Sequence, residues 1–124
     1  RTIWKNRKER SSVIVGGRGS QTFLDSINDG THGFFVGTGS IVPKHSMQVY
    51  NFAIEGKMNE ARAIVERHEN PFLSKAKEFG WHAALKAGLH EIGIMPLTER
   101  PPMVPISKEQ RNELRTIMKE AGWI

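Results

Sequence analysis

Two short apolar runs, each followed by glycines, dominate the pattern in the first half of the chain. Residues 13–16 and 33–37 are continuously apolar or glycine, with many branched and aromatic side chains, which is typical of strands buried on both faces in a parallel sheet. Glycine-rich loops follow at 16–20 and 37–40, and a segment with helical periodicity follows each loop. This order predicts a right-handed βαβ unit followed by a further helix. Both loops should then lie at the carboxyl edge of the sheet, where α/β folds bind ligands.

The helices that follow these loops have sequence signals at both ends. Ser20 precedes the first helix, expected over 21–28, and a serine at this position can cap a helix by accepting a hydrogen bond from its first turn. Asp29-Gly30 should end that helix. Pro43 is expected to open the second helix and Gly56 to close it.

From residue 57 onward the pattern contains helices only. Apolar residues recur at helical spacing from Met58, and this helix should end near Asn70-Pro71 because proline removes a backbone donor. Helical spacing continues up to Phe79 and again over 81–92, where Gly93 stops it. These segments predict a stack of amphipathic helices.

A stiff connector separates the last helix from the others. The stretch 100–105 contains three prolines and must be extended. Ser107 and Gln110 form a capping box, which predicts that the last helix begins directly after the connector. The chain therefore divides into a strand-containing part, residues 1–56, and a helical part, residues 57–124.

The strand-containing part should be a slice of a larger sheet. Two strands cannot form a stable sheet alone, because their edges and faces need covering. The chain has 124 residues and begins Arg1-Thr2-Ile3, without an initiator methionine or an apolar leader. We therefore expect that the missing strands come from preceding sequence or from a partner chain.

Charge and apolar content narrow the possible partners. The net charge is +5, and five basic residues lie in the first ten positions, which predicts a polar surface helix there. A nucleic-acid patch is the alternative interpretation, but no stacking aromatic residue is interleaved with these charges beyond Trp4. No apolar run approaches the ~18 residues of a membrane span. We expect neither nucleic acid nor a membrane as partner.

Residues suited to metals, disulfides and dinucleotides are absent or badly spaced. The chain has no cysteine, which excludes disulfides, thiolate metal sites and a thiol nucleophile, and which fits a cytoplasmic protein. The five histidines show no spacing typical of a metal site. The Gly17-Arg18-Gly19 segment, followed by Thr22, matches a dinucleotide-binding loop poorly. No metal and no cofactor are expected.

Five motifs in order resemble the dihydrodipicolinate synthase / N-acetylneuraminate lyase family over nearly the whole chain. They are a strand with its glycine loop at 13–17, a second strand at 32–36, Gly56-Lys57 followed by Glu60-Ala61-Arg62, the helix motif at 85–93 and the proline connector at 100–107. The resemblance implies the carboxyl-terminal portion of a (β/α)8 TIM barrel, with strands seven and eight near 13–16 and 33–37. An extra helical layer would then follow from residue 57.

The resemblance also implies a class I aldolase or lyase mechanism. A lysine on strand six of such barrels forms a Schiff base with pyruvate or another 2-keto acid, and the imine accepts electrons when an adjacent bond breaks. In that alignment the lysine lies upstream, so this chain would hold no catalytic residue and would be inactive alone. The family commonly forms homodimers or homotetramers, and we expect the same here.

The substrate-binding residues that the resemblance implies lie on the two glycine loops and the strand ends: Gly17, Arg18, Gly19, Ser20, Phe35, Gly37 and Thr38. Arg18 and Gly19 replace residues that are often acidic in the family, which points to a substrate tail carrying carboxylate or phosphate. Alternatively, Arg18 is a solvated turn residue, Thr38 caps the following helix, and the Phe35 side chain belongs to the core or to a pocket wall. Lys86 is interpreted as structural.

A second hypothesis for the whole chain remains open. The chain could be a basic, mostly helical binding module whose glycine loops or N-terminal arginines hold phosphate or nucleic acid. Ordered glycine loops that face a hollow at the sheet edge would favour the lyase instead.

Overall fold

The computed structural model describes residues 12–124, and the predicted surface helix at 1–10 lies outside them. Strands β1 (Ile14–Gly16) and β2 (Gly33–Phe35) are parallel, with Ile14 opposite Gly33 and Gly16 opposite Phe35. The helix α2 (Gln21–Ser26) and the 3-10 turn η1 (Ile27–Asp29) connect them. This confirms the predicted βαβ unit, although both strands are shorter than expected.

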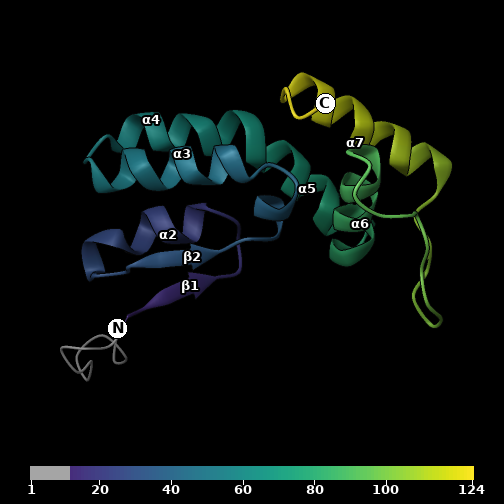
Figure 1. The fold of residues 1–124 in the computed structure, drawn as a ribbon, viewed down its shortest axis with the longest axis horizontal. Coiled ribbons are helices and arrows are strands. Elements are labelled where there is room, and N and C mark those ends of the chain that lie inside the picture. Colours follow the sequence, from purple (N-terminus) through teal and green to yellow (C-terminus); the bar gives the residue numbers. More distant parts are fainter. Residues whose placement is uncertain (1–11) are drawn as a thin grey trace.

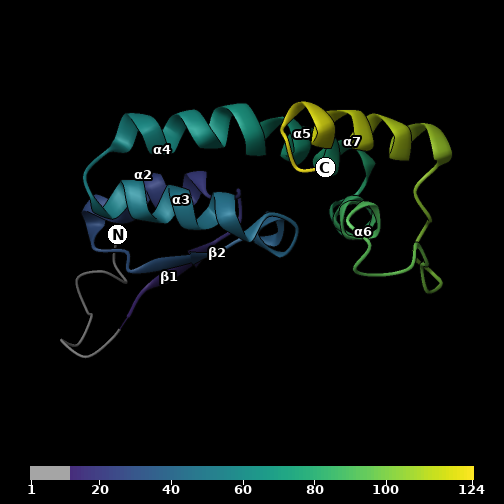
Figure 2. The ribbon, with the colours of Figure 1, turned by 45° about the horizontal axis from the view of Figure 1, so that its top comes forward.

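Helices cover one face of this small sheet. The turn η2 (Gly37–Ser40) follows β2 and leads into α3 (Pro43–Ile54), which begins at the predicted proline. Figures 1 and 2 show α2, α3 and α4 (Met58–Ile64) together on one side of the two strands. Their apolar side chains meet the sheet in a first core, formed by Phe23, Leu24, Val49, Ala53, Ala61 and Val65.

Within residues 12–124, no helix or strand covers the opposite face of the sheet or its outer edges. Ile14 is 67% exposed and Phe35 is 78% exposed. The expectation that these strands are buried on both faces is therefore wrong for the chain as described, because helices lie on one side only. A continuous apolar run predicts two-sided burial only where the rest of a sheet is present.

A long helical stretch connects the two ends of the molecule. It comprises α4, a π-helical segment η3 (Val65–Glu69) and α5 (Asn70–Phe79). The predicted boundary near Asn70-Pro71 coincides with the start of α5, although the backbone stays helical across it; Pro71 lies in the first turn of α5, where a missing N–H is tolerated. The wider π turn directly before it accommodates the ring without ending the helix.

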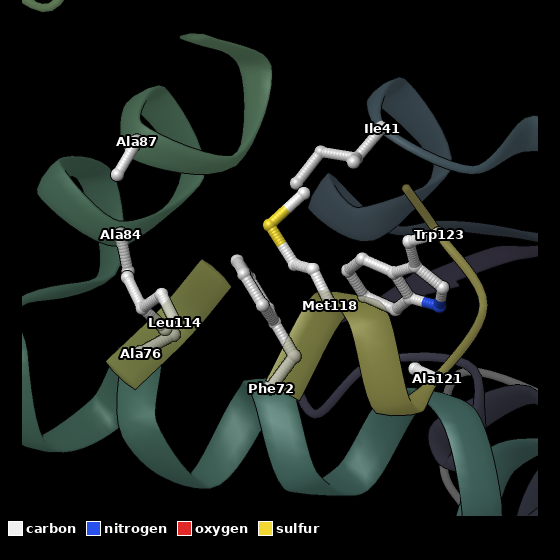
Figure 3. Close-up of a cluster of buried hydrophobic side chains, with 9 residues drawn as sticks. All are labelled: Ile41, Phe72, Ala76, Ala84, Ala87, Leu114, Met118, Ala121 and Trp123. Atoms are coloured by element: carbon white, nitrogen blue, oxygen red, sulfur yellow. The ribbon is translucent and has the colours of Figure 1, made fainter. Parts of the chain in front are cut away.

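The second core lies between the last three helices, α5, α6 (Trp81–Glu91) and α7 (Lys108–Glu120). Figure 3 shows its buried side chains: Ile41, Phe72, Ala76, Ala84, Ala87, Leu114, Met118, Ala121 and Trp123. Ile41 comes from the segment after β2, so this core also anchors the second glycine loop. The helical layer and the loops at the sheet edge are therefore packed as one unit.

The connector and the last helix agree with their sequence signals. Residues 94–107 contain no helix or strand. Ser107 and Gln110 form the predicted capping box, with the Gln110 backbone N–H donating to Ser107 Oγ at 3.2 Å and the Ser107 N–H donating to Gln110 Oε1 at 3.0 Å. Within residues 12–124, no helix has the length and apolar character that a membrane crossing requires.

Candidate functional site

Two neighbouring hollows lie beside the glycine loops at the carboxyl ends of β1 and β2. The first, of about 490 Å³, is called the basic hollow and is lined by Gly17, Arg18, Gly19, Gln21, Asn70, Leu73, Ser74, Lys77 and Trp81. The second, of about 390 Å³, is called the apolar hollow and is lined by Gly17, Phe35, Val36, Gly37, Ser40, Trp81, His82, Leu85 and Leu89. Gly17 and Trp81 belong to both, so the two hollows adjoin one another.

The basic hollow has the chemistry of an anion site. Arg18 and Lys77 line it from the loop and from α5, and none of its lining residues is acidic. The nearest carboxylate to Arg18 is that of Asp25, at 4.0 Å, and the arginine side chain is largely exposed. A loose, solvated contact of this kind leaves the guanidinium able to bind another anion.

Loop backbone forms the side of the basic hollow next to Arg18. The Arg18 N–H donates a hydrogen bond to Thr22 Oγ1 at 3.2 Å, which ties the loop to the first turn of α2. Gly19 has a φ of +65°, and a Cβ atom there would lie 2.5 Å from Leu73 Cδ1. The left-handed φ therefore favours glycine, and a side chain here would also have to displace Leu73 of α5.

The apolar hollow lies at the end of β2. Phe35 is exposed on the uncovered side of the strand, so its side chain does not belong to the core of residues 12–124; it lines the apolar hollow. At Gly37 a Cβ atom would lie 2.7 Å from Leu85 Cδ1 and 3.1 Å from Trp81 Cζ2. A larger residue at 37 would therefore have to displace the Leu85 side chain, because α6 lies close to the loop.

Ser20 and Thr38 are turned away from both hollows, although both were expected to bind substrate. Each is 1% exposed. Ser20 has helical dihedral angles and its side chain makes no capping hydrogen bond, so the predicted cap is wrong. The Thr38 hydroxyl instead donates to Glu69 Oε1 at 2.5 Å, and the Ser20 N–H donates to Glu69 Oε2 at 3.0 Å.

Glu69 is the polar residue that our sequence reasoning missed. It lies at the end of η3, is 6% exposed, and contacts both glycine loops. The sequence did contain a signal for it. Glu69 belongs to a stripe at helical spacing whose other members, at positions 61, 65, 72 and 76, are apolar and buried. A carboxylate on such a stripe needs a compensating partner.

His45 and His68 line the same small cavity as Glu69. The rings of His45 and His68 are 5.0 Å apart, and Nδ1 of His68 lies 2.9 Å from the Ala121 carbonyl oxygen. Burial, together with the nearby His68, lowers the pKa of His45 from its ordinary value of 6.5. Among residues 12–124, no group of three or more histidine or acidic side chains is arranged to hold a metal ion.

The His45 pKa gives the protein an expected pH dependence. A lowered pKa in the folded state means that the unfolded chain binds the proton more readily, so stability falls as the pH drops below 6.5. We expect a His45→Gln variant to lose less stability than wild type between about pH 7.5 and about pH 5.5. Urea unfolding at both pH values checks this, with exposed His82→Gln as the control. Equal losses in His45→Gln and wild type would contradict the prediction.

Lys86 is already occupied by structural contacts. Its ammonium donates to Glu99 Oε2 at 2.7 Å and to the Thr98 carbonyl oxygen at 3.2 Å. These bonds attach α6 to the connector, as the structural interpretation of this lysine expects. A Schiff-base lysine must instead present a free amine to a pocket.

Comparison with known proteins supports the resemblance found in the motifs. The model of the dihydrodipicolinate synthetase family matches residues 2–121. A solved dihydrodipicolinate synthase is 26% identical with a TM-score of 0.77, and the match covers 91% of this chain and 38% of that one. The enzyme from Acinetobacter baumannii, described as chloride-inhibited and complexed with pyruvate, is 25% identical with a TM-score of 0.77 over 90% of this chain and 38% of its own.

A third solved structure is similar in fold. It is described as the first monomeric dihydrodipicolinate synthase variant, is 22% identical and has a TM-score of 0.75, with 90% of this chain and 37% of that chain covered. This chain thus spans less than two fifths of the length of the three solved structures. The two parallel strands and the helices correspond to part of these barrel enzymes.

Proposed function

Because this chain belongs to the dihydrodipicolinate synthetase family, we propose that it forms the carboxyl-terminal part of a Schiff-base lyase. The enzyme would act on pyruvate or another 2-keto acid as an aldolase, synthase or dehydratase. The observation that carries the proposal is the pairing of two glycine loops at one sheet edge, each beside a hollow. The pyruvate complex of the Acinetobacter baumannii relative supports the choice of substrate class.

In the proposed reaction a lysine outside this chain attacks C2 of the keto acid. Water leaves, and the protonated imine accepts the electron pair when the neighbouring carbon loses a proton or a carbon–carbon bond breaks. The residues described here would not take part in that covalent step. They would form the wall of the substrate pocket, with the Phe35 and Gly37 end of β2 nearest the keto acid.

The uncovered sheet supports a place at the end of a larger barrel. Ile14, Phe35 and Met47 are exposed, and a third hollow, of about 420 Å³, lies between β2 and α3. Neighbouring strands of a (β/α)8 barrel would cover such surfaces. We propose that β1 and β2 are the last two strands of that barrel and that residues 57–124 form the extra helical layer. Assembly as a homodimer or homotetramer remains part of the proposal.

The alternative hypothesis of a nucleic-acid module has less support. Its main basis, the basic cluster in the first ten residues, lies outside the described part of the chain. The family match instead covers nearly the whole sequence. Salt-sensitive binding of the complete protein to random duplex DNA, without keto-acid binding, would favour the alternative.

The decisive experiment is reductive trapping. The complete protein that contains this chain is incubated with pyruvate and borohydride, and its intact mass is measured with and without the reductant. We expect the mass to increase by one reduced pyruvate per polypeptide. No adduct with pyruvate or with other 2-keto acids would overturn the proposal.

The charges of the basic hollow predict a preference among second substrates. Arg18 and Lys77 should favour aldehydes that carry phosphate or carboxylate, such as glyceraldehyde 3-phosphate over glyceraldehyde and succinic semialdehyde over butyraldehyde. Replacing both residues with methionine should lower kcat/KM for the charged member of each pair about tenfold and leave the neutral member unchanged. Initial rates with all four aldehydes check this.

A control variant replaces a lysine that lies outside both hollows. Lys44→Met takes a charge from the exposed first turn of α3, away from both hollows. It should leave the preference intact. An equal loss for charged and neutral aldehydes in the double variant would show that the two cations do not select the substrate tail.

A further inference from the structure

Glu69 connects parts of the chain that are distant in sequence. Its carboxylate lies between the loop after β1 and the loop after β2, and its two bonding partners are 49 and 31 residues away. It is 6% exposed. Within residues 12–124 no arginine, lysine or histidine forms a salt bridge with it. The two loops therefore supply its hydrogen-bond donors.

Each carboxylate oxygen serves one loop. Oε2 accepts the backbone N–H of Ser20 at 3.0 Å, and Oε1 accepts the hydroxyl of Thr38 at 2.5 Å. Hydrogen bonds to an ionised acceptor are shorter and stronger than those between neutral groups. One rigid side chain on the helical layer thus sets the positions of both loops relative to each other.

Packing around the carboxylate leaves little freedom. A Cβ atom at Gly19 would lie 3.0 Å from Glu69 Oε1, so the first loop fits closely over the acid. An apolar residue at this stripe position would fill the core without the cost of burying a carboxylate. Glu69 instead accepts a hydrogen bond from each of two loops that border the hollows, so its role is more specific than filling space.

We propose that Glu69 is a positioning residue that holds the loops 17–20 and 37–40 in register, so that the walls of the basic and apolar hollows keep their relative geometry. Its effect on catalysis rests on the proposed function, whereas its effect on loop order does not. Glu69 touches no substrate in this scheme. It acts through Ser20 and Thr38.

Hydrogen–deuterium exchange on the complete protein tests the structural half. In Glu69→Ala we expect amides of both loops to exchange roughly 10- to 100-fold faster, as expected for the loss of a charge-assisted hydrogen bond. Thr38→Val should affect mainly the loop 37–40. Glu69→Gln keeps the shape and one acceptor oxygen, so it should lie between Glu69→Ala and wild type. Amides in α7 should be unchanged in all three.

Kinetics with pyruvate test the functional half. We expect kcat/KM to fall in the order wild type, Glu69→Gln, Glu69→Ala, with the Gln variant partly restoring the rate. Glu69→Ala and Thr38→Val should not be additive, because both remove the same hydrogen bond. Glu66→Gln is the matched control, since it removes the same charge from an exposed position on the same helical segment.

The outcomes separate the two proposals. If the amides of both loops exchange at the wild-type rate in Glu69→Ala, the positioning role is overturned. It is also overturned if Glu69→Gln and Thr38→Val speed amide exchange equally in all helices. Additive kinetic effects of Glu69→Ala and Thr38→Val would also count against it. If wild type forms no pyruvate adduct, the lyase proposal fails, and exchange at the loops still decides whether Glu69 ties them together.

Discussion

Replacing Phe72 with alanine is expected to lower the free energy of unfolding by about 3–5 kcal/mol, because it removes a fully buried aromatic ring and leaves a cavity. Phe72 is 0% exposed and lies at the centre of the second core. Its ring centroid is 5.0 Å from that of Trp123, and a Cβ atom at Gly88 of α6 would lie 3.4 Å from Phe72 Cζ. Figure 3 shows the ring between Met118, Trp123 and the helix α6.

Several of the buried residues in this core are alanines, which are too short to fill the space that the ring would vacate. Ala76, Ala84 and Ala87 are short, and they belong to helices held by other contacts in the same core. Urea unfolding of the complete protein, followed by circular dichroism, measures the change in free energy. Val104→Ala, at a residue that is 79% exposed, serves as the control and should be nearly neutral. A loss below about 1 kcal/mol for Phe72→Ala would show that the core collapses around the cavity.

Replacing Gly19 with alanine is expected to displace the first loop. The φ of +65° is unfavourable for alanine, and the new Cβ would lie 2.5 Å from Leu73 Cδ1 and 3.0 Å from Glu69 Oε1. Strain and steric conflict together should cost about 2–4 kcal/mol. Because the neighbouring Ser20 N–H bonds Glu69, movement of the loop should also break that hydrogen bond.

Gly56→Ala isolates the steric part of the Gly19 effect. Gly56 has a φ of +78°, and nothing lies within 4 Å of its hypothetical Cβ. This variant should therefore show only the backbone cost of about 1 kcal/mol. Urea unfolding of both variants gives the difference, and trapping with pyruvate reports on the loop. Equal losses in the two variants would mean that the close approach to α5 is unimportant.

Local signals in the sequence predicted most of the helices. Pro43 opens α3, the Ser107–Gln110 capping box opens α7, and Gly93 follows the end of α6. These signals work because each acts within one turn of its own helix. Pro71 likewise marks the start of α5, but the sequence did not reveal the π-helical turn that joins α5 to the preceding helix.

The candidate site was predicted only in part. The sequence placed Gly17, Arg18, Gly19, Phe35 and Gly37 near a ligand, and each of them lines one or both hollows. It could not show that the Ser20 backbone N–H and the Thr38 hydroxyl both meet the buried Glu69, because a short segment does not reveal its contacts with a distant helix.

The sequence by itself determined the βαβ unit, the helical second half and the family, because apolar periodicity, glycine and proline positions and motif order are properties of neighbouring residues. Only the tertiary structure decided which loop residues face a hollow and which meet Glu69 across 31 and 49 positions. The physical reason is that a hydrogen bond between distant segments depends on how the helices pack, and packing depends on the whole core rather than on any local pattern.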